Sequence, residues 1–312
     1  MDVFDACKDI VTIVVPCFNE EAALPHFYTA VSEVVQDMPI QYEFHFVNDG
    51  STDGTLEILH QLSNQDPHVY YDSFSRNFGK EAAMYAGLKA SRGNYVVIMD
   101  ADLQHPPKLL KTMYERLQES GADCAAAHRV DRTGEGSLRN FCSRKFYQLI
   151  NAICCVKMDD GAGDYRMMSR QMVDSLLSFH EVNRYSKGLF SYIGFQTIWI
   201  DYENVNRQEG TSKWSMRSLF LYALEGITAF SNVPLLLAAV FGLIFCLVGF
   251  IILLYILFFR FDKVFLIICL LFFIGGMQML FTGIFGEYLA KNVAEARHRP
   301  LYIIKETNRR QY

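Results

Sequence analysis

The stretch IVTIVVPCFNE, Ile10 to Glu20, is an apolar, β-branched run that ends in a proline and a polar turn. Such runs, bounded by turn-forming residues, are typical of buried strands. The pattern returns further along the chain, at Glu43–Val47, Val69–Phe74 and Tyr95–Met99. Intervals with helical spacing lie between or after these runs, at 21–36, 55–62, 80–90 and 107–119. Strands that alternate with helices predict an α/β domain with a parallel sheet covered on both faces.

Composition excludes some classes of protein and divides the chain in two. The 312 residues carry a formal net charge of -5, which argues against a nucleic-acid-binding protein, because such proteins usually present a basic face. The 8 cysteines show no zinc-binding or redox CxxC spacing, which indicates reduced thiols in a cytosolic compartment. Charged and apolar residues are mixed in the first two thirds of the chain, whereas the stretch after Pro234 is almost free of charge. We therefore expect a soluble domain followed by a membrane domain.

Two long apolar runs near the C-terminus predict a transmembrane hairpin. Leu235–Phe259 is a run without a charge, and as a helix of about 25 residues it would reach roughly 37 Å and cross a hydrocarbon core of about 30 Å. The polar link Arg260–Lys263 separates it from a second run, Val264–Gly286. Lysine and arginine gather outside the two runs, so the positive-inside rule predicts a protein of the cytoplasmic membrane with both termini in the cytosol.

The bounds of these two apolar runs predict how the chain is divided into domains. We expect a cytosolic catalytic domain, a juxtamembrane segment, two transmembrane helices and a cytosolic tail, at 1–215, 216–234, 235–287 and 288–312. Gly275, Gly276, Gly283 and Gly286 would let helices approach closely, either within the hairpin or between the subunits of a homo-oligomer. The segment Ser137–Cys155 is amphipathic, and it predicts either a helix lying in the membrane interface or an ordinary core-packed helix.

The polar loops after the predicted strands are candidate sites, because ligands of parallel sheets bind beyond the carboxyl ends of the strands. Asp49 can accept hydrogen bonds from a base or a ribose, and we favour contact with a ligand for it. The next polar residues are favoured for turn and helix-capping roles: Ser51, Thr52 and Asp53. Arg76 and Lys80 bring two cations to the start of a predicted helix, a position suited to anions.

The stretch Met99–Pro106, MDADLQHP, carries the clearest chemical signal. Asp100 and Asp102 follow a buried strand, where unpaired charges are costly. A divalent cation would remove that cost, and hard oxygen ligands suit Mg²⁺ or Mn²⁺, which bind through one or two carboxylates plus the phosphates of a substrate. The alternative is a pair of helix-capping aspartates before the proline. We expect His105 to be a structural neighbour of the site and not a ligand.

With these motifs the sequence resembles the family 2 glycosyltransferases, and within them the polyisoprenyl-phosphate enzymes related to bactoprenol glucosyltransferases and dolichol-phosphate mannose synthases. The resemblance covers nearly the whole chain, including the tail Gly286–Ile303. It rests on VPCFNE at Val15–Glu20, NDGSTDGT at Asn48–Thr55, SRNFGKE at Ser75–Glu81, MDADLQHP at Met99–Pro106, GAGDYR at Gly161–Arg166 and RQEGTSKWS at Arg207–Ser215.

The resemblance implies a GT-A fold, a nucleotide-sugar donor and a divalent metal ion. Donor contacts would come from Pro16, Asn19, Glu20, Asp49, Arg76, Lys80, Asp100 and Gln104. The metal, Mg²⁺ or Mn²⁺, would be held by Asp100 and Asp102. Contacts with the acceptor phosphate and the diphosphate would come from Arg129, Ser143 and Arg144 and from a mobile loop with Arg207, Ser212, Lys213 and Trp214.

The implied reaction is an inverting transfer of a hexose from a uridine diphosphate sugar to a polyprenyl phosphate. Glucose is the favoured sugar, and N-acetylglucosamine or another hexose is the alternative. Asp102 and Asp164 are the candidate catalytic residues, and the resemblance makes Asp164 the candidate general base. A phosphate monoester with a second pKa near 6 is already largely ionised at pH 7, so we expect Asp164 to orient the sugar or the acceptor instead.

Other functions fit the sequence less well. A processive polysaccharide synthase would need more membrane helices and usually a QxxRW motif, which the sequence lacks. A sugar-1-phosphate nucleotidyltransferase would need a glycine-rich loop after the first strand, and PCFNE is not one. A non-enzymatic sensor or scaffold that binds nucleotide sugars at the membrane is the alternative from a different class.

Overall fold

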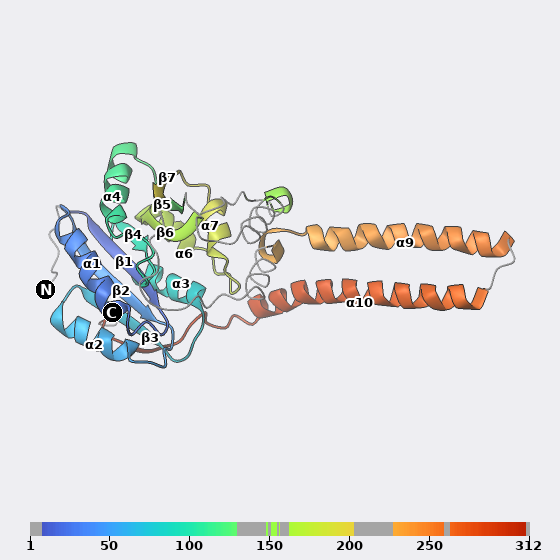
Figure 1. The fold of residues 1–312 in the computed structure, drawn as a ribbon, viewed down its shortest axis with the longest axis horizontal. Helices are drawn as coiled ribbons and strands as arrows, with labels where there is room; N and C mark the ends of the chain where they lie inside the picture. The colour runs from blue at the N-terminus through green and yellow to red at the C-terminus, as the bar shows by residue number, and fades with distance from the viewer. Residues whose placement is uncertain are drawn as a thin grey trace.

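The computed structural model describes residues 8–129, 148, 151–154, 156, 162–202, 227–258 and 263–309. Within these residues an α/β domain forms around one sheet, and two long helices project from one side of the domain (Figure 1). The described sheet has eight strands in the order β7-β5-β6-β4-β1-β2-β3-β8.

The first half of the domain alternates strands and helices as the sequence predicts. Its strands are β1 (Ile10–Cys17), β2 (Gln41–Asn48), β3 (Val69–Phe74) and β4 (Tyr95–Ile98). Its helices are α1 (Leu24–Gln36), α2 (Thr55–Gln65), α3 (Lys80–Ala90) and α4 (Leu109–Ser120). The pairs β1–β2, β2–β3 and β1–β4 are all parallel, so the four carboxyl ends meet at one edge. The expected parallel α/β arrangement is confirmed for this half.

The other half makes the sheet mixed, and the expectation of a wholly parallel sheet is wrong there. It adds the strands β5 (Cys124–Arg129), β6 (Ala162–Ser169), β7 (Thr197–Tyr202) and β8 (Ile304–Thr307), and the helices α6 (Arg170–Leu177) and α7 (Ser186–Tyr192). Strand β6 lies antiparallel to both β4 and β5, and β8 lies antiparallel to β3. The sequence of β6, AGDYRMMS, hides this strand because it carries two charged residues in place of an apolar run.

The side chains of β1 divide the core between the two faces of the sheet. Val11, Ile13 and Val15 pack with α1, α2 and α4 on one face. Val14 packs with α3, α6 and α7 on the other face. All four valine and isoleucine side chains are at most 1% exposed, which is the pattern of a central strand covered on both sides. Helix layers on the two faces therefore fix the sheet and its carboxyl edge.

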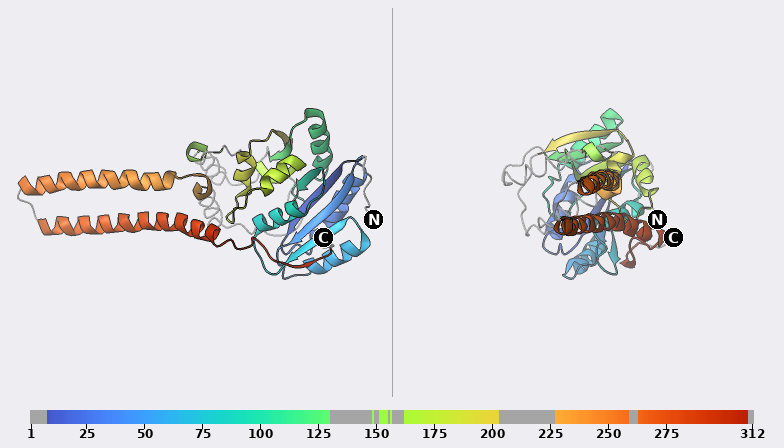
Figure 2. Two further views of the ribbon diagram at one scale, coloured as in Figure 1. Left: turned by 180° about the vertical axis from the view of Figure 1, so that it is seen from behind. Right: turned by 90° about the vertical axis from the view of Figure 1, so that its right-hand side faces the viewer.

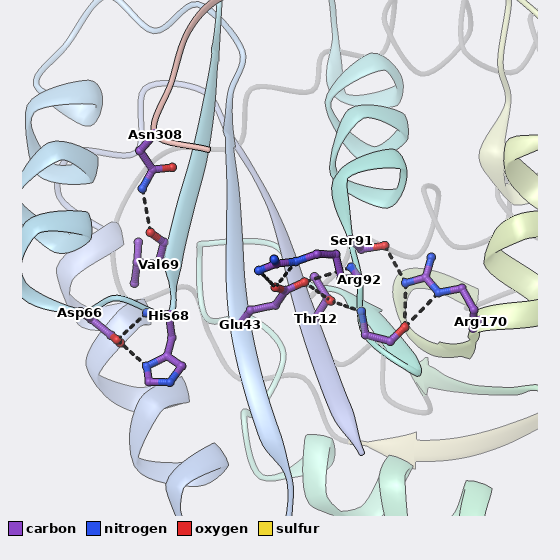
Figure 3. A network of polar contacts seen from close by, with 10 residues as sticks. Thr12, Glu43, Asp66, His68, Val69, Ser91, Arg92, Arg170 and Asn308 are labelled. Carbon is purple, nitrogen blue, oxygen red and sulfur yellow. Dashed lines mark hydrogen bonds and ion pairs between the residues drawn. The ribbon is translucent and has the colours of Figure 1, made fainter. Parts of the chain in front are cut away.

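Two buried carboxylates of the sheet each have their own arginine. Glu43 on β2 is 2% exposed and accepts hydrogen bonds from Arg92 Nη2 at 2.9 Å and Thr12 Oγ1 at 2.6 Å (Figure 3). Arg170 donates to Gly93 O at 2.7 Å, so the turn before β4 is tied to both β2 and α6. The second of these carboxylates is Asp72 on β3, which is fully buried.

Asp72 holds the C-terminal strand against the edge of the sheet. It lies opposite Thr307 of β8 and accepts hydrogen bonds from Arg309 Nη2 at 2.5 Å and, in the matching tautomer, from His45 Nε2 at 3.0 Å. Burial opposes ionisation, but these partners outweigh it and hold the pKa of Asp72 below its usual range. Asn308 Nδ2 adds a hydrogen bond to Val69 O at 2.9 Å (Figure 3). The tail that follows the second long helix thus returns to the sheet and covers the exposed edge of β3.

The two long helices are α9 (Val233–Phe258) and α10 (Lys263–Ala296), and they run side by side away from the sheet (Figures 1 and 2). Phe245 and Phe273 meet edge to face, with ring centroids 5.0 Å apart. In the described part of the chain, one helix is long and apolar enough to cross a membrane, over Val233–Ile252, with mean hydropathy 3.0. The described neighbours leave open space within 4 Å of the Cβ positions of the four α10 glycines, Gly275, Gly276, Gly283 and Gly286. The described side chains of α9 therefore do not pack closely on these glycines.

We predict that Arg309→Met lowers the free energy of unfolding by about 2 kcal/mol, because it leaves the Asp72 charge buried with fewer partners. Lys305→Met, a change of the same kind at an exposed position of β8, should cost less than about 0.5 kcal/mol. The pKa of Asp72 is lowered by folding, so the difference between wild type and Arg309→Met should be present at neutral pH and shrink as the pH falls through about 4. Unfolding of the detergent-purified protein, followed by fluorescence from pH 3 to 8, measures this. Equal losses for the two variants would contradict it.

Candidate active site

The polar loops that follow β1 and β2 are joined by hydrogen bonds. Asn19 N donates to Ser51 Oγ at 2.9 Å, and Asn19 Oδ1 accepts from Thr52 N at 2.9 Å. Asn19 adopts φ 55°, a left-handed conformation that asparagine tolerates better than most residues. Asp53 accepts from Thr55 N at 3.1 Å in a turn around Gly54, the N-cap of α2, which agrees with its expected turn role. Ser51 and Thr52 instead connect the two loops.

Asp49 joins the second loop to the third. Its side chain is buried, and its two carboxylate oxygens accept from Phe78 N at 2.6 Å and Gly79 N at 2.9 Å. Burial raises the pKa of Asp49 although these two hydrogen bonds oppose the rise. Gly79 has φ 98°, and at Gly50 a Cβ would lie 2.3 Å from the backbone of Arg76. Asp49 therefore fixes the start of α3 in this structure, while its contact with a nucleotide stays a prediction.

Lys80 is the first residue of α3 and lies between two carboxylates from different strands. Its Nζ is 2.7 Å from Asp100 Oδ1 and 2.8 Å from Asp164 Oδ2. Burial opposes the charge of Lys80, but the two carboxylates outweigh it and raise the pKa of the ammonium. For Asp164, burial opposes ionisation, but the charges of Lys80 and Lys187 outweigh it and hold the pKa well below its usual range. At neutral pH the Lys80 ammonium and the Asp164 carboxylate are therefore both charged.

The register of β4 and β6 explains why two residues so far apart in sequence share one lysine. Ile98 of β4 lies opposite Arg166 of β6 in the antiparallel pair. Continuing this register by two residues brings Asp100, just after β4, opposite Asp164. The carboxyl end of β4 and the amino-terminal half of β6 thus form one acidic edge.

The loop after β4 presents its second carboxylate beside the first. Gln104 N donates to Asp102 Oδ1 at 3.2 Å, and Leu103 has φ 54°, so the chain turns sharply between the two residues. Among the described residues, no group of three or more metal-binding side chains is preformed. Asp100 and Asp102 nevertheless fit Mg²⁺ or Mn²⁺, because such ions take one or two carboxylates and complete their shell with water and substrate phosphates. The ammonium of Lys80 between Asp100 and Asp164 indicates that this edge attracts cations.

Two further charged residues, Glu81 and Lys187, support the acidic edge, and neither is among the predicted site residues. Glu81 accepts from Ser186 N at 3.1 Å and from Ser186 Oγ at the start of α7. Burial raises the pKa of Glu81 to about 7. This contact fixes the first turn of α7, and the next residue, Lys187, acts electrostatically on Asp164. Glu81 closes the motif SRNFGKE, so the motif itself was the signal that could have found it.

Of the other predicted site residues, the structure describes some and leaves others outside the described residues. Pro16 lies near the end of β1, and the exposed Arg76 guanidinium lies 4.3 Å from the centre of the Phe78 ring. Arg129 is the last residue of β5 and pairs with Tyr202. The remaining acceptor residues lie outside the described residues: Ser143, Arg144, Arg207, Ser212, Lys213 and Trp214. The segment 137–155 is described only at 148 and 151–154.

His105 has no predicted role as a ligand, and its packing agrees with that expectation. Its ring centroid lies 5.0 Å from that of Tyr165 and 5.5 Å from that of Tyr202. Burial lowers the pKa of His105, which favours the neutral imidazole. The ring therefore packs beside the loop that carries Asp100 and Asp102.

Comparison with known proteins agrees with this geometry. The family model described as "Glycosyl transferase family 2" matches residues 12–177. The putative glycosyltransferase CsbB of Bacillus subtilis is 41% identical over 96% of this chain and 93% of its own length. The bactoprenol glucosyl transferase of Shigella phage SfV is 39% identical over 95% of this chain and 98% of its own length.

Among solved structures, the mannosyltransferase PcManGT from Pyrobaculum calidifontis, in complex with GDP-Man and Mn²⁺, superposes with a TM-score of 0.50. The match covers 72% of this chain and 63% of that one at 18% identity, which supports the α/β GT-A fold alone. The family match over more than half of the chain and the near full-length relatives agree. The chain belongs to glycosyl transferase family 2, and it is a glycosyltransferase.

Proposed function

We propose that the protein transfers a hexose, glucose in the first place, from a uridine diphosphate sugar to a polyprenyl phosphate, with inversion at the anomeric carbon. The observation that carries the proposal is the acidic edge of Asp100 and Asp164 around Lys80, at the end of the sheet where donor loops meet. Near full-length similarity to the bactoprenol glucosyl transferase of Shigella phage SfV supports glucose and the lipid acceptor.

Asp100 and Asp102 would hold Mg²⁺ or Mn²⁺. When bound, the ion would neutralise the charge that develops on the departing diphosphate. The linked loops around Asn19 and Asp49 are rigid enough to hold the nucleoside, since each makes hydrogen bonds to a neighbouring loop. Lys80 supplies a further positive charge beside the position of the diphosphate.

Asp164 orients the reactants in this proposal and does not need to accept a proton. Its pKa is held low, so it stays ionised and can accept a hydrogen bond from a sugar hydroxyl. The acceptor phosphate, with its second pKa near 6, is itself an anionic nucleophile at pH 7. One of its oxygens attacks the anomeric carbon as the bond to the diphosphate breaks, and rate enhancement comes mainly from position and charge.

The membrane hairpin is part of the same proposal. Helix α10 has 34 residues, so at about 1.5 Å per residue it is longer than a hydrocarbon core of about 30 Å and can continue beyond the bilayer. The polar end of α10 contacts the catalytic domain, since Glu295 Oε1 accepts from Val182 N at 2.7 Å. With α9 and α10 both crossing, residues 235–287 form the spans, and the parts before and after them lie in the cytosol with nucleotide sugars. A homo-oligomer is compatible with the open glycine face of α10.

We predict that Asp102→Asn lowers turnover of UDP-glucose with undecaprenyl phosphate by at least about 10²-fold, because the metal loses one of its two carboxylates. Chelation should have the same effect on wild type, and added Mn²⁺ should reverse it. Asp37→Asn, at the exposed end of α1, is the matched control and should keep wild-type turnover. Release of UDP, measured with a panel of nucleotide sugars, provides the assay and names the preferred sugar. Full activity of Asp102→Asn in the presence of chelator would contradict the metal assignment.

We predict that the wild-type rate falls on acidification with a midpoint near pH 6, which is the second pKa of the acceptor phosphate. The lowered pKa of Asp164 keeps this carboxylate ionised well below that midpoint. Asp164→Asn should therefore reduce the rate by about 10²-fold and keep the same midpoint. Loss of the acidic limb in this variant would identify Asp164 as a titrating base. A rate near wild type with intact folding would remove both roles.

A further inference from the structure

The ammonium of Lys80 forms ion pairs with two carboxylates. Its Nζ contacts Asp100 Oδ1 at 2.7 Å and Asp164 Oδ2 at 2.8 Å. The side chain of Asp100 is 31% exposed and that of Asp164 is 17% exposed, so of the two carboxylates Asp100 lies nearer the solvent and Asp164 lies deeper. One contact is therefore easier to break than the other.

The backbone of Lys80 is fixed although its side chain is long and flexible. The N–H of the preceding Gly79 donates to Asp49 Oδ2 at 2.9 Å, and the next residue, Glu81, is bound to Ser186 of α7. Four methylene groups let the ammonium swing by a few ångströms without moving the helix. The contact with Asp100 can thus open while the fold is unchanged.

A divalent cation and the Lys80 ammonium compete for Asp100. Both are cations, and Lys80 Nζ already contacts both oxygens that Asp100 can offer to a metal, Oδ1 at 2.7 Å and Oδ2 at 2.9 Å. A metal ion that binds alone must displace the ammonium and then repel it. Asp164 remains as one partner for Lys80, but one of its two carboxylate contacts is lost.

A diphosphate removes this conflict. Its oxygens bind the metal and carry charge to the same edge, where the N-terminus of α3 also favours anions. The displaced ammonium then exchanges Asp100 for a phosphate oxygen and keeps Asp164. The number of its anionic partners is restored.

We propose that Lys80 makes the binding of the divalent cation and of the nucleoside diphosphate interdependent, by yielding Asp100 to the cation and taking a phosphate oxygen in return. The identity of the two ligands rests on the proposed function. Lys80 is a positioning residue in this role, and it keeps the affinity for metal alone low. By reciprocity, each ligand raises the affinity for the other by the same factor.

The test measures Mn²⁺ binding to the full-length, detergent-purified protein by electron paramagnetic resonance of the free ion, without and with UDP. Lys80→Met should bind Mn²⁺ alone about tenfold more tightly than wild type, and the gain from UDP should shrink by a similar factor. Lys80→Arg, which keeps a cation, should retain weak Mn²⁺ binding. Lys80→Gln provides a second neutral variant, and thermal unfolding verifies that each protein is folded.

Lys89→Met is the matched control because it removes one positive charge from an exposed position in the last turn of the same helix, α3. Its affinity for Mn²⁺ alone should change by less than about twofold. Unchanged or weaker Mn²⁺ binding in both neutral Lys80 variants would overturn the proposal, and so would an equal gain in Lys89→Met. These readings need no acceptor and no turnover, so they fail independently of the proposed transfer reaction.

Discussion

The antiparallel pairing of β6 with β4 is the constraint on which the site depends. Without this pairing, Asp100, just after β4, and Asp164, on β6, would not be neighbours in space. The shared register brings both carboxylates to Lys80, whose own position is fixed by the hydrogen bonds of Asp49 to the turn before α3. The acidic edge is thus a product of sheet topology, and the loops add the parts that face a ligand.

Two pairs of carboxylates in the described part of the chain are matched with cations in different ways. Glu43 and Asp72 each have an arginine of their own, Arg92 and Arg309. Asp100 and Asp164 share the ammonium of Lys80, and Asp102 adds a third carboxylate two residues beyond Asp100. The first arrangement stabilises a structure, whereas the second attracts a further cation. This contrast within one chain is the physical basis for assigning metal and diphosphate to that edge.

Much of the fold could be predicted from sequence where one local pattern decides it. The strands up to β4 follow from apolar runs that end in turns, and α9 and α10 follow from uncharged runs. Strands β6 and β8 could not be predicted this way, since one contains Asp164 and Arg166 and the other is IKET. In the site, Asp100 and Lys80 were found from their loops, but Glu81 and Lys187 were missed. Glu81 contacts Ser186 of α7, 105 residues further along the chain, and Lys187 of α7 acts on Asp164 of β6. No local pattern encodes such contacts.

The central claim is that this acidic edge transfers a sugar to a lipid phosphate in a single displacement. The most direct measurement offers the purified protein UDP-glucose, undecaprenyl phosphate and Mn²⁺, and determines the mass and the anomeric configuration of the product. The account predicts a lipid monophosphate that has gained one hexose, with the configuration inverted relative to the donor. A product with retained configuration, or glucose delivered only to water or a soluble alcohol, would contradict it.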